Sequence, residues 1–412
     1  MTRESKSKSV VAETRGPPGS GKTLVDSVSA RYRRGTIRAT KGSSILRYFG
    51  FKDDPFAIGS VSSHPELVSD STRRTLHNLA EKSGFASESG SNMLLVGPEG
   101  VGKSLLLHLL SETLDISMGS GFAEYVDAAR TWGGQEAGEG SLGFRTWAGS
   151  IDFRTTRLLL VDNIDRLVDS VPQFLDLLAG MTKNPLTLVL GVNLPTYWYL
   201  VGSRNLSKTF PISMQVPQQE PREIEGWLKS SIRSSAGGSE PFDEIAYQTL
   251  ASYSLGLPGL AANFTQDCLR VASNLGVTRL RRPLITRIAD MLLYSQGVRI
   301  AHGQIRLEGT KAEIAWEALR ELYLRGEVRR GWIVEVFAEN LARSTLSYHL
   351  RDLVEDQILI PARFGFRMHY KVARPVRAAL QILQSRRTRA ENTISIGPVP
   401  RTGTTRAKGG DG

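Results

Sequence analysis

The hydrophobic positions in the middle of the chain alternate between short apolar runs and longer helical patterns. Residues 93–96 form an apolar run before a glycine-rich turn, and residues 104–114 follow as a leucine-dense helical pattern. Further apolar runs at 122–127, 158–161 and 187–192 have the length and composition of strands, and helical or loop sequence separates them. Strands that alternate with helices predict an α/β fold, with a mostly parallel sheet and helices on its faces.

The pattern changes in the second half of the chain. Strand signals disappear between residues 220 and 296, where helical patterns follow one another. Beyond Leu307 three short helical faces are followed by two apolar runs, at 358–360 and 368–372, with Phe364-Gly365-Phe366 between them as the turn of a hairpin. Three short helices and a hairpin are the pattern of a winged helix.

The charge of the chain is concentrated at its ends. The formal net charge is +11, and residues 1–47 carry eleven Lys and Arg against three acidic residues. Residues 361–412 carry eleven against two, so the segment between them has a net charge of −6. Basic ends around an acidic centre indicate contact with a polyanion, nucleic acid first. The alternative is that the basic ends are only solvated tails.

Composition excludes several classes of protein. The single cysteine, Cys268, excludes an internal disulfide framework and a cysteine-based zinc cluster, and it fits a reducing compartment. No run approaches the roughly 18–20 apolar residues that cross a bilayer, and the first residues lack the apolar region of a signal peptide. We therefore expect a cytoplasmic, nucleoid-associated protein without a membrane partner.

Two segments match the phosphate-binding pattern G-x-x-x-x-G-K-[ST], namely Gly16–Thr23 and Gly97–Ser104. In this motif glycines let backbone N–H groups converge on phosphate oxygens, the lysine neutralises the terminal phosphates, and the hydroxyl binds Mg²⁺. The loop must lie between a buried strand and a helix. Residues 93–96 supply that strand for the second copy, whereas residues 9–14 contain only two valines. The second copy is therefore the expected ATP site, and the first is interpreted as a vestige or coincidence.

The expected ATP site uses every residue of the second loop. Its members are Gly97, Pro98, Glu99, Gly100, Val101, Gly102, Lys103 and Ser104. Mg²⁺ also needs an acidic strand end, and Asp162 follows the apolar run at 158–161. Ser104 and Asp162 are thus the expected magnesium ligands, with Asp162 acting through water.

Three further residues are candidates for catalysis. Asn193 follows the strand candidate at 187–192, where its amide could reach the terminal phosphate or the attacking water. Arg204 precedes a strand candidate at 210–216 and could enter the site of a neighbouring subunit as an arginine finger, or else be a solvated loop residue. Asp165 could act as a general base, or else be a surface residue that caps the next helix.

Taken in order, these motifs resemble those of the AAA+ ATPases. Within that family they resemble the motifs of the origin-recognition replication initiators and their relatives. The match covers roughly Tyr48 to Val372. The resemblance implies a Walker A motif at the second loop, a Walker B motif ending at Asp162, a sensor-1 asparagine at 193, a helical lid and a winged helix. The segment 48–56 (YFGFKDDPF) also looks like the one that precedes the P-loop in ExeA-type and transposition-regulator relatives.

The sequence departs from the family pattern at two positions that affect turnover. Asn163 stands where most relatives have a carboxylate that activates water, and Gly259 stands where the ExeA-type branch has an arginine after Gly256-Leu257-Pro258. General-base catalysis is typically worth ~10²–10⁴ in rate. Slow hydrolysis is therefore expected unless Asp165 serves as the base, and whether the chain is an enzyme stays open.

The resemblance divides the chain into an AAA+ nucleotide-binding domain (44–216), a helical lid (217–300) and a winged-helix domain (305–384). Basic, disordered tails are expected at 1–43 and 385–412. The third helix of the winged helix would present one set of DNA contacts and the hairpin another. These expected contacts are Arg343, Ser344, Thr345, Ser347, Tyr348 and Arg351 on the helix, and Arg363, Arg367 and Lys371 on the hairpin.

The sequence thus predicts a protein that binds ATP, Mg²⁺ and double-stranded DNA, with the nucleotide controlling DNA engagement or assembly in replication initiation or a related transaction. Homo-oligomers or other replication and recombination proteins are possible partners. One alternative is a non-hydrolysing transcriptional regulator that uses ATP as a structural ligand. Another is an accessory ATPase of transposition or secretion whose winged helix binds protein.

Overall fold

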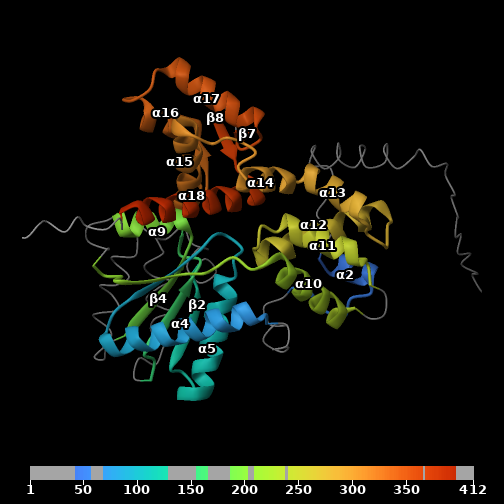
Figure 1. Ribbon diagram of the computed structural model, residues 1–412, viewed down its shortest axis with the longest axis vertical. Coiled ribbons are helices and arrows are strands. Elements are labelled where there is room, and N and C mark those ends of the chain that lie inside the picture. The colour runs from blue at the N-terminus through green and yellow to red at the C-terminus, as the bar shows by residue number, and fades with distance from the viewer. Residues whose placement is uncertain are drawn as a thin grey trace, which may run out of the picture.

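The central element of the fold is a five-stranded parallel sheet (Figure 1). The computed structural model describes residues 42–56, 68–128, 155–165, 186–202, 208–236, 240–364 and 367–395. The strands are β1 (Met93–Val96), β2 (Ala123–Asp127), β3 (Leu158–Asp162), β4 (Thr187–Val192) and β5 (Ile212–Gln215). Their order is β2-β3-β4-β1-β5, and every pair is parallel. The predicted α/β class, a mostly parallel sheet with helices on its faces, is confirmed.

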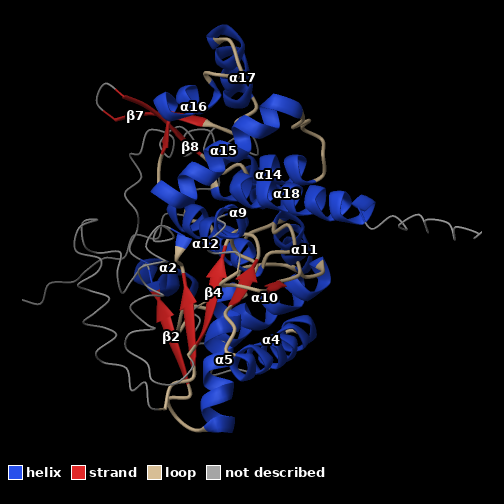
Figure 2. Cartoon of the chain, turned by 90° about the vertical axis from the view of Figure 1, so that its left-hand side faces the viewer, coloured by secondary structure: helices blue, strands red, loops and turns tan. Residues whose placement is uncertain are grey.

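The sheet is buried on both faces, which explains its continuous apolar strands. Every residue of β1, β3 and β4 is buried. On one face Met93 and Leu95 join a core with Leu107 of α5 (Lys103–Met118), beside α4 (Asp70–Ser89). On the other face Leu94 and Val96 join a core with α9 (Leu194–Gly202). Figure 2 shows the strands with their carboxyl ends directed toward α9.

A helical region follows the sheet. It contains α10 (Pro221–Ser235), α11 (Glu244–Tyr253), α12 (Pro258–Leu275), α13 (Arg282–Met291) and α14 (Tyr294–Ala301). Local signals define the ends of these helices. Glu220 and Glu223 form a capping box at the start of α10, and Gly276 ends α12 in a left-handed conformation. The early helix α2 (Gly42–Phe49) also packs against α12.

The next unit has its own apolar core and a small antiparallel sheet. In chain order it contains α15 (Gly309–Arg325), β6 (Val328–Arg329), α16 (Arg330–Phe337), α17 (Arg343–Glu355), β7 (Ile360–Phe364) and β8 (Arg367–Lys371). The strands pair in the order β6-β8-β7. Leu346, Leu350 and Leu353 of α17 point into this core, so the opposite face of α17 is exposed.

The last described element, α18 (Arg374–Ser395), differs from the expectation for this part of the chain. A tail was expected from Ser385, but the helix continues through Ser395. Its arginine content resembles that of a tail, yet its apolar residues follow a helical spacing. Ala378 and Ile382 join the core shared by the sheet and the helical region α10–α14. Val376 and Leu380 join the separate core of the unit α15–β8. Among the described helices, none is long and apolar enough to cross a membrane.

A backbone hydrogen bond joins the helical region to the P-loop. The N–H of Gly259 in α12 donates a hydrogen bond to the carbonyl oxygen of Gly100, at 2.7 Å. A Cβ atom on Gly259 would lie 2.9 Å from the Cα and 3.0 Å from the oxygen of Gly100. Position 259 therefore has no room for a side chain in this arrangement.

We predict that Gly259→Ala destabilises the protein by about 1–3 kcal/mol, the usual cost of overpacking a tight contact. The matched control is Gly226→Ala, because Gly226 is an exposed glycine inside α10 whose added Cβ would meet nothing within 4 Å. The control should be neutral or stabilising by about 0.5–1 kcal/mol. Urea unfolding measures both, and equal stability of the two variants would show that α12 does not press on the P-loop.

Candidate functional site: a phosphate loop beneath the last helix

The loop between β1 and α5 has the backbone that an anion site requires. Gly100 and Gly102 adopt positive φ angles of 84° and 105°, which favour glycine. Gly97 is also required, since a Cβ there would lie 2.7 Å from Cγ1 of Val101. Helix α5 begins at Lys103, and the first N–H groups of a helix have no partner within it. These donors and the helix dipole favour a negative group at the loop.

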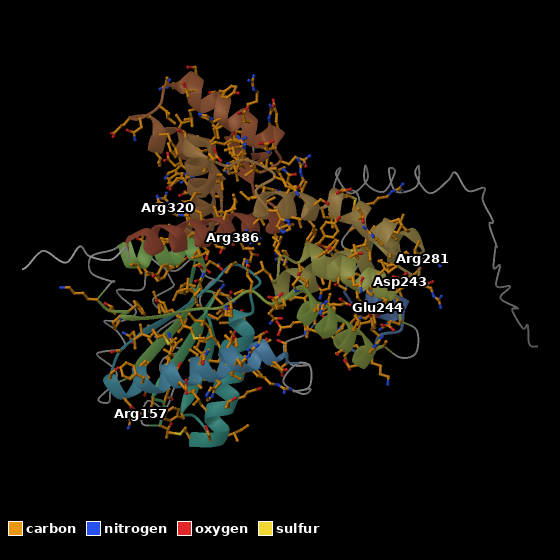
Figure 3. The ribbon with its side chains drawn as sticks, viewed as in Figure 1. Arg157, Asp243, Glu244, Arg281, Arg320 and Arg386 are labelled. Atoms are coloured by element: carbon orange, nitrogen blue, oxygen red, sulfur yellow. The ribbon has the colours of Figure 1, made fainter. Side chains whose placement is uncertain are left out.

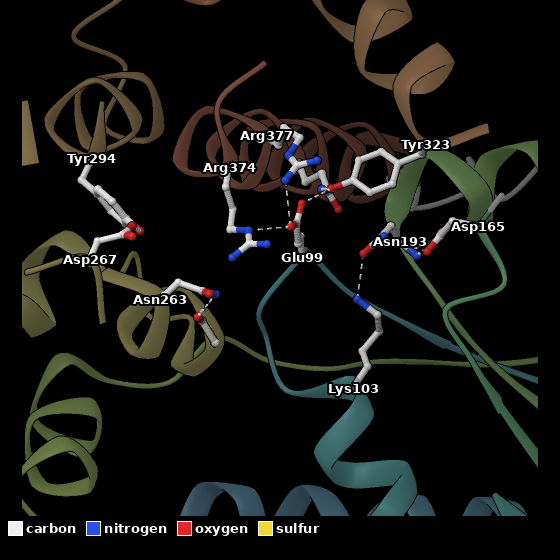
Figure 4. Close-up of polar contacts among 12 residues, drawn as sticks. Glu99, Lys103, Asp165, Asn193, Asn263, Asp267, Tyr294, Tyr323, Arg374 and Arg377 are labelled. Carbon is white, nitrogen blue, oxygen red and sulfur yellow. Dashed lines mark hydrogen bonds and ion pairs between the residues drawn. The ribbon is translucent and has the colours of Figure 1, made fainter. Parts of the chain in front are cut away.

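Lys103 is buried beneath this loop. Its Nζ donates to the carbonyl oxygens of Gly97 (2.8 Å) and Pro98 (3.0 Å) and to Oδ1 of Asn193 (2.9 Å). Burial lowers the pKa of Lys103, and the carboxylates of Asp165, Asp162 and Glu99 oppose that change. The structure thus brings the predicted lysine and the predicted sensor asparagine into direct contact, as Figure 4 shows.

Asp162 and Ser104 lie together on the other side of the loop. Asp162 ends β3 and is 2% exposed, and the Ser104 side chain hydrogen-bonds to it. Burial raises the pKa of Asp162, while Ser104 and Lys103 act to lower it. Gly191 leaves room for this carboxylate, because a Cβ there would lie 3.0 Å from Oδ1 of Asp162. A hydroxyl and a carboxylate are oxygen ligands of the type that Mg²⁺ prefers, so the donor set fits the predicted metal.

Asp165 is half-buried and lies behind Asn193. Its Oδ1 accepts hydrogen bonds from the backbone N–H of Asn193 (3.1 Å) and the hydroxyl of Thr196 (2.5 Å), and its Oδ2 accepts from Nδ2 of Asn193 (2.9 Å). Burial raises the pKa of Asp165. Both oxygens are engaged in holding Asn193, so a direct role as base has no geometric support here, and the segment that Asp165 was alternatively expected to cap lies outside the described residues.

This contact fixes which way the Asn193 amide points. Asp165 accepts from Nδ2, which leaves Oδ1 to accept from Lys103. An ionised carboxylate offers only acceptors, so it selects this orientation of the amide. Asp165 thus acts on the loop through Asn193.

Asn163 points away from the lysine. Its side chain is exposed and its φ is +56°, and Nδ2 donates to Oδ1 of Asp127 at 3.2 Å. Asp127 ends β2 in register with Asp162 on β3. Sequence reasoning missed this third carboxylate at the sheet edge, although its place at the end of a strand candidate was a usable signal.

A hollow next to the loop was not foreseen. It encloses about 50 Å³ and opens to solvent, so it is a narrow hollow, smaller than a typical ligand pocket. Val101, Gly102 and Leu105 form its wall on the loop side, while Thr72 and Trp227 face them from α4 and α10. Its lining residues come from five separate stretches of sequence, so periodicity could not reveal it.

Glu99 points toward the C-terminal part of the chain. Its Oε2 accepts from the hydroxyl of Tyr323 on α15 (2.6 Å), and its Oε1 accepts from Nε of Arg374 and NH2 of Arg377, both on α18 (3.1 Å each). Figure 4 shows all three side chains converging on the Glu99 carboxylate. These partners are more than 220 residues away in sequence, and no motif marks them.

The predicted DNA-binding residues of α17 lie on its exposed face. The exposed members are Arg343, Ser344, Thr345, Ser347, Tyr348 and Arg351. Arg351 lies over the ring of Tyr348, at 5.5 Å from its centroid, and pairs with Glu355 at 3.7 Å. On the hairpin, Arg363 and Lys371 are exposed. The side chain of Arg367 lies outside the described part of the structure, as do Arg204 and the first loop copy, Gly16–Thr23.

A groove with several arginines adjoins this face. Its lining includes Arg325, Arg329, Arg330, Trp332 and Arg343, from α15, β6, α16 and α17. Ion pairs with Glu321 and Glu327 partly neutralise the first two. Three of these arginines were not among the predicted contacts, because they belong to helical and strand segments that were assigned only by their apolar faces.

Comparison with known proteins gives similar solved structures but no family. No family model matches the chain, and no curated protein matches its sequence. Similar structures include the Aeropyrum pernix ORC1 protein in complex with DNA (16% identity, TM-score 0.42, covering 78% of this chain and 94% of that one). The structure of the Aeropyrum pernix ORC2 protein in its ADPNP–ADP complexes is 13% identical with a TM-score of 0.37. That match covers 77% of this chain and 94% of the ORC2 chain.

A third similar structure is the Thermotoga maritima RuvB Holliday junction branch migration motor. It is 16% identical, has a TM-score of 0.37, and the match covers 75% of this chain and 94% of that one. At such identities and TM-scores, the function has to be inferred from the residues of this chain.

We predict that Asp165→Asn lowers the free energy of unfolding by about 1–3 kcal/mol, because the new NH₂ group would face the NH₂ group of Asn193 and leave buried donors unpaired. Rotating the Asn193 amide does not remove the conflict, since Nδ2 would then face Lys103. Asp53→Asn is the control, because Asp53 is exposed, and it should stay within about 0.5 kcal/mol of the wild type. Urea unfolding measures the difference, and equal stability of both variants would contradict this role of Asp165.

Proposed function

We propose that the chain binds ATP with Mg²⁺ at the loop 97–104. The observation that carries this proposal is the buried contact between Lys103 and Asn193, which joins the loop to the end of the neighbouring strand β4. Gly100, Gly102 and the first turn of α5 would hold the phosphates through backbone N–H groups. Ser104 and Asp162 would hold Mg²⁺, which supplies charge neutralisation at the phosphates.

The hollow between α4, α10 and the loop is the proposed site for the base of the nucleotide. It is continuous with the loop through Val101 and Gly102, and it combines apolar walls with the hydroxyls of Ser69, Ser71 and Thr72. Apolar surfaces with a few polar groups are typical of small-molecule sites. A nucleotide that fills both parts would therefore contact the sheet and the lid at once.

Hydrolysis at this site is proposed to be slow. Asn163 is directed to Asp127, the Asp165 carboxylate is engaged with Asn193, and Gly259 contributes no side chain. The site retains the groups proposed to bind phosphate and metal, but among the described residues no carboxylate is free to activate an attacking water. A slow ATPase acts as a nucleotide-dependent switch better than as a motor. Arg204, if it enters a neighbouring subunit, would make turnover depend on assembly.

The second part of the proposal is that the unit α15–β8 is a winged helix that binds double-stranded DNA. Its elements, α15, β6, α16, α17 and the β7–β8 hairpin, include the three helices and the hairpin of the sequence-based expectation, which supports the proposal. In such a unit α17 would enter the major groove and the hairpin would contact the backbone. The exposed arginines of α17 and the arginine-lined groove beside it support contact with phosphates. ATP would then control DNA engagement or assembly, in replication initiation or a related transaction.

Lys103→Ala is expected to abolish ATP binding, because it removes the buried cation of the loop. Lys22→Ala, in the other copy of the motif, should bind ATP as the wild type does. Titration with a fluorescent ATP analogue in the presence of Mg²⁺ measures both variants. The reverse result would place the nucleotide at the N-terminal copy and refute the site proposed above.

Arg343→Ala combined with Arg363→Ala should weaken binding to random duplex DNA and lower the slope of log K against log salt by about two, since two phosphate contacts are lost. A matched control with the same charge change is Arg281→Ala with Arg282→Ala, exposed positions at the start of α13 in the lid (Arg281 is labelled in Figure 3). Fluorescence anisotropy of the full chain at several salt concentrations measures the slopes. Unchanged binding by the first pair would favour a protein-binding role for this unit.

A further inference from the structure

We propose that Arg374 and Arg377 of α18 form a binding pair for the terminal phosphate of ATP, and that Glu99 of the P-loop occupies this pair in competition with that phosphate. The proposal rests on the nucleotide site proposed above. It assigns a role to two residues that lie outside every motif of that site.

The pair already holds an anion. The Glu99 carboxylate accepts from Nε of Arg374 and NH2 of Arg377 at 3.1 Å each, and from the Tyr323 hydroxyl at 2.6 Å. Two arginines at the first turn of a helix suit a phosphate group, because guanidinium groups match its geometry and the helix dipole favours negative charge. The occupant here is a side chain that belongs to the P-loop itself.

The pair has capacity that Glu99 does not use. Within the described part of the chain, Nε of Arg377 is a buried donor without a hydrogen-bond partner. Arg374 is 46% exposed, so part of its side chain faces solvent and has room to turn. A buried guanidinium N–H that lacks an acceptor is costly, and a phosphate oxygen would satisfy it. A carboxylate offers two oxygens, whereas a terminal phosphate offers three and more negative charge.

The position of the pair suits the phosphate that the loop would hold. Glu99 is the third residue of the loop 97–104, and its charge is close enough to Lys103 to affect the pKa of that lysine. The lid contributes no side chain to the loop at position 259, because Gly259 of α12 packs directly on Gly100. Helix α18 therefore supplies cations to the loop where the lid does not.

The pair would also connect the nucleotide to the unit proposed to bind DNA. Val376 and Leu380 of α18 lie in the same apolar core as Leu346 and Leu350 of α17. Tyr323, on α15, also receives a hydrogen bond from Gln381 of α18, at 2.8 Å. A terminal phosphate that draws the arginines away from Glu99 would thus act on α15 and α18 together. A ligand shifts such an arrangement only by its difference in affinity for the two states, so ATP should differ from ADP.

The test compares ATP with ADP in the full chain. Arg374→Ala with Arg377→Ala should weaken the binding of a fluorescent ATP analogue by about tenfold to a hundredfold, the effect of losing one or two charged hydrogen bonds. The matching ADP analogue should change by less than about threefold, since it lacks the terminal phosphate. Glu99→Gln should have the opposite sign and bind ATP several times more tightly, because a neutral amide competes less well for the arginines.

Arg386→Ala is the matched control on the same helix. Arg386 donates to the carbonyl oxygen of Ala301, away from the loop, and it is labelled in Figure 3. This variant should leave both affinities unchanged. If the double arginine variant and Glu99→Gln both keep the wild-type ratio of ATP to ADP affinity, the pair is only a structural link and the inference is overturned.

The outcomes also separate this inference from the proposed nucleotide site. If the wild type binds neither ATP nor ADP, the site itself is refuted. Suppose that the wild type binds both nucleotides, that Lys103→Ala abolishes binding, and that replacing Arg374 and Arg377 leaves the ratio of ATP to ADP affinity unchanged. The nucleotide site is then supported, and only the role of the arginine pair is refuted. Should the double variant fail to fold, Glu99→Gln, which keeps the shape of the side chain, decides the question alone.

Discussion

The arrangement of the site depends on one buried amide. Asn193 stands between Lys103 of the P-loop and Asp165, and it can serve both only in a single orientation. Because an unpaired polar group in the interior is costly, this chain of donors and acceptors fixes the end of β4 against the beginning of α5. The glycines of the loop, the carboxylate of Asp162 and the start of α12 are all arranged around that fixed point.

The sequence was sufficient for the parts of the fold that depend on local pattern. The five strands of the sheet and the helices of the C-terminal unit follow from apolar periodicity, and the P-loop follows from glycine spacing before a helix. The α/β class was therefore predictable. The assignment of Lys103, Ser104, Asp162 and Asn193 to one place also followed from sequence, because parallel strands end at the same edge of a sheet.

Contacts between segments that are distant in sequence could not be predicted from local patterns. The role of Asp165 depends on which neighbour its oxygens accept from, and sequence order alone gave a choice between a base and a surface cap. Helix α18 was missed because its arginines resemble those of a disordered tail, whereas its apolar residues are divided between two cores. The partners of Glu99 are 224 to 278 residues away, so only the folded chain brings them together.

The backbone contact between Gly259 and Gly100 also constrains how this chain could evolve. A single codon change that introduced arginine at position 259 would place a side chain against the loop before any benefit to catalysis could arise. Accommodating a longer side chain there would require α12 to move first, and α12 is held by the same core that supports the sheet. A cation for the loop would therefore be easier to supply from another part of the fold than from position 259.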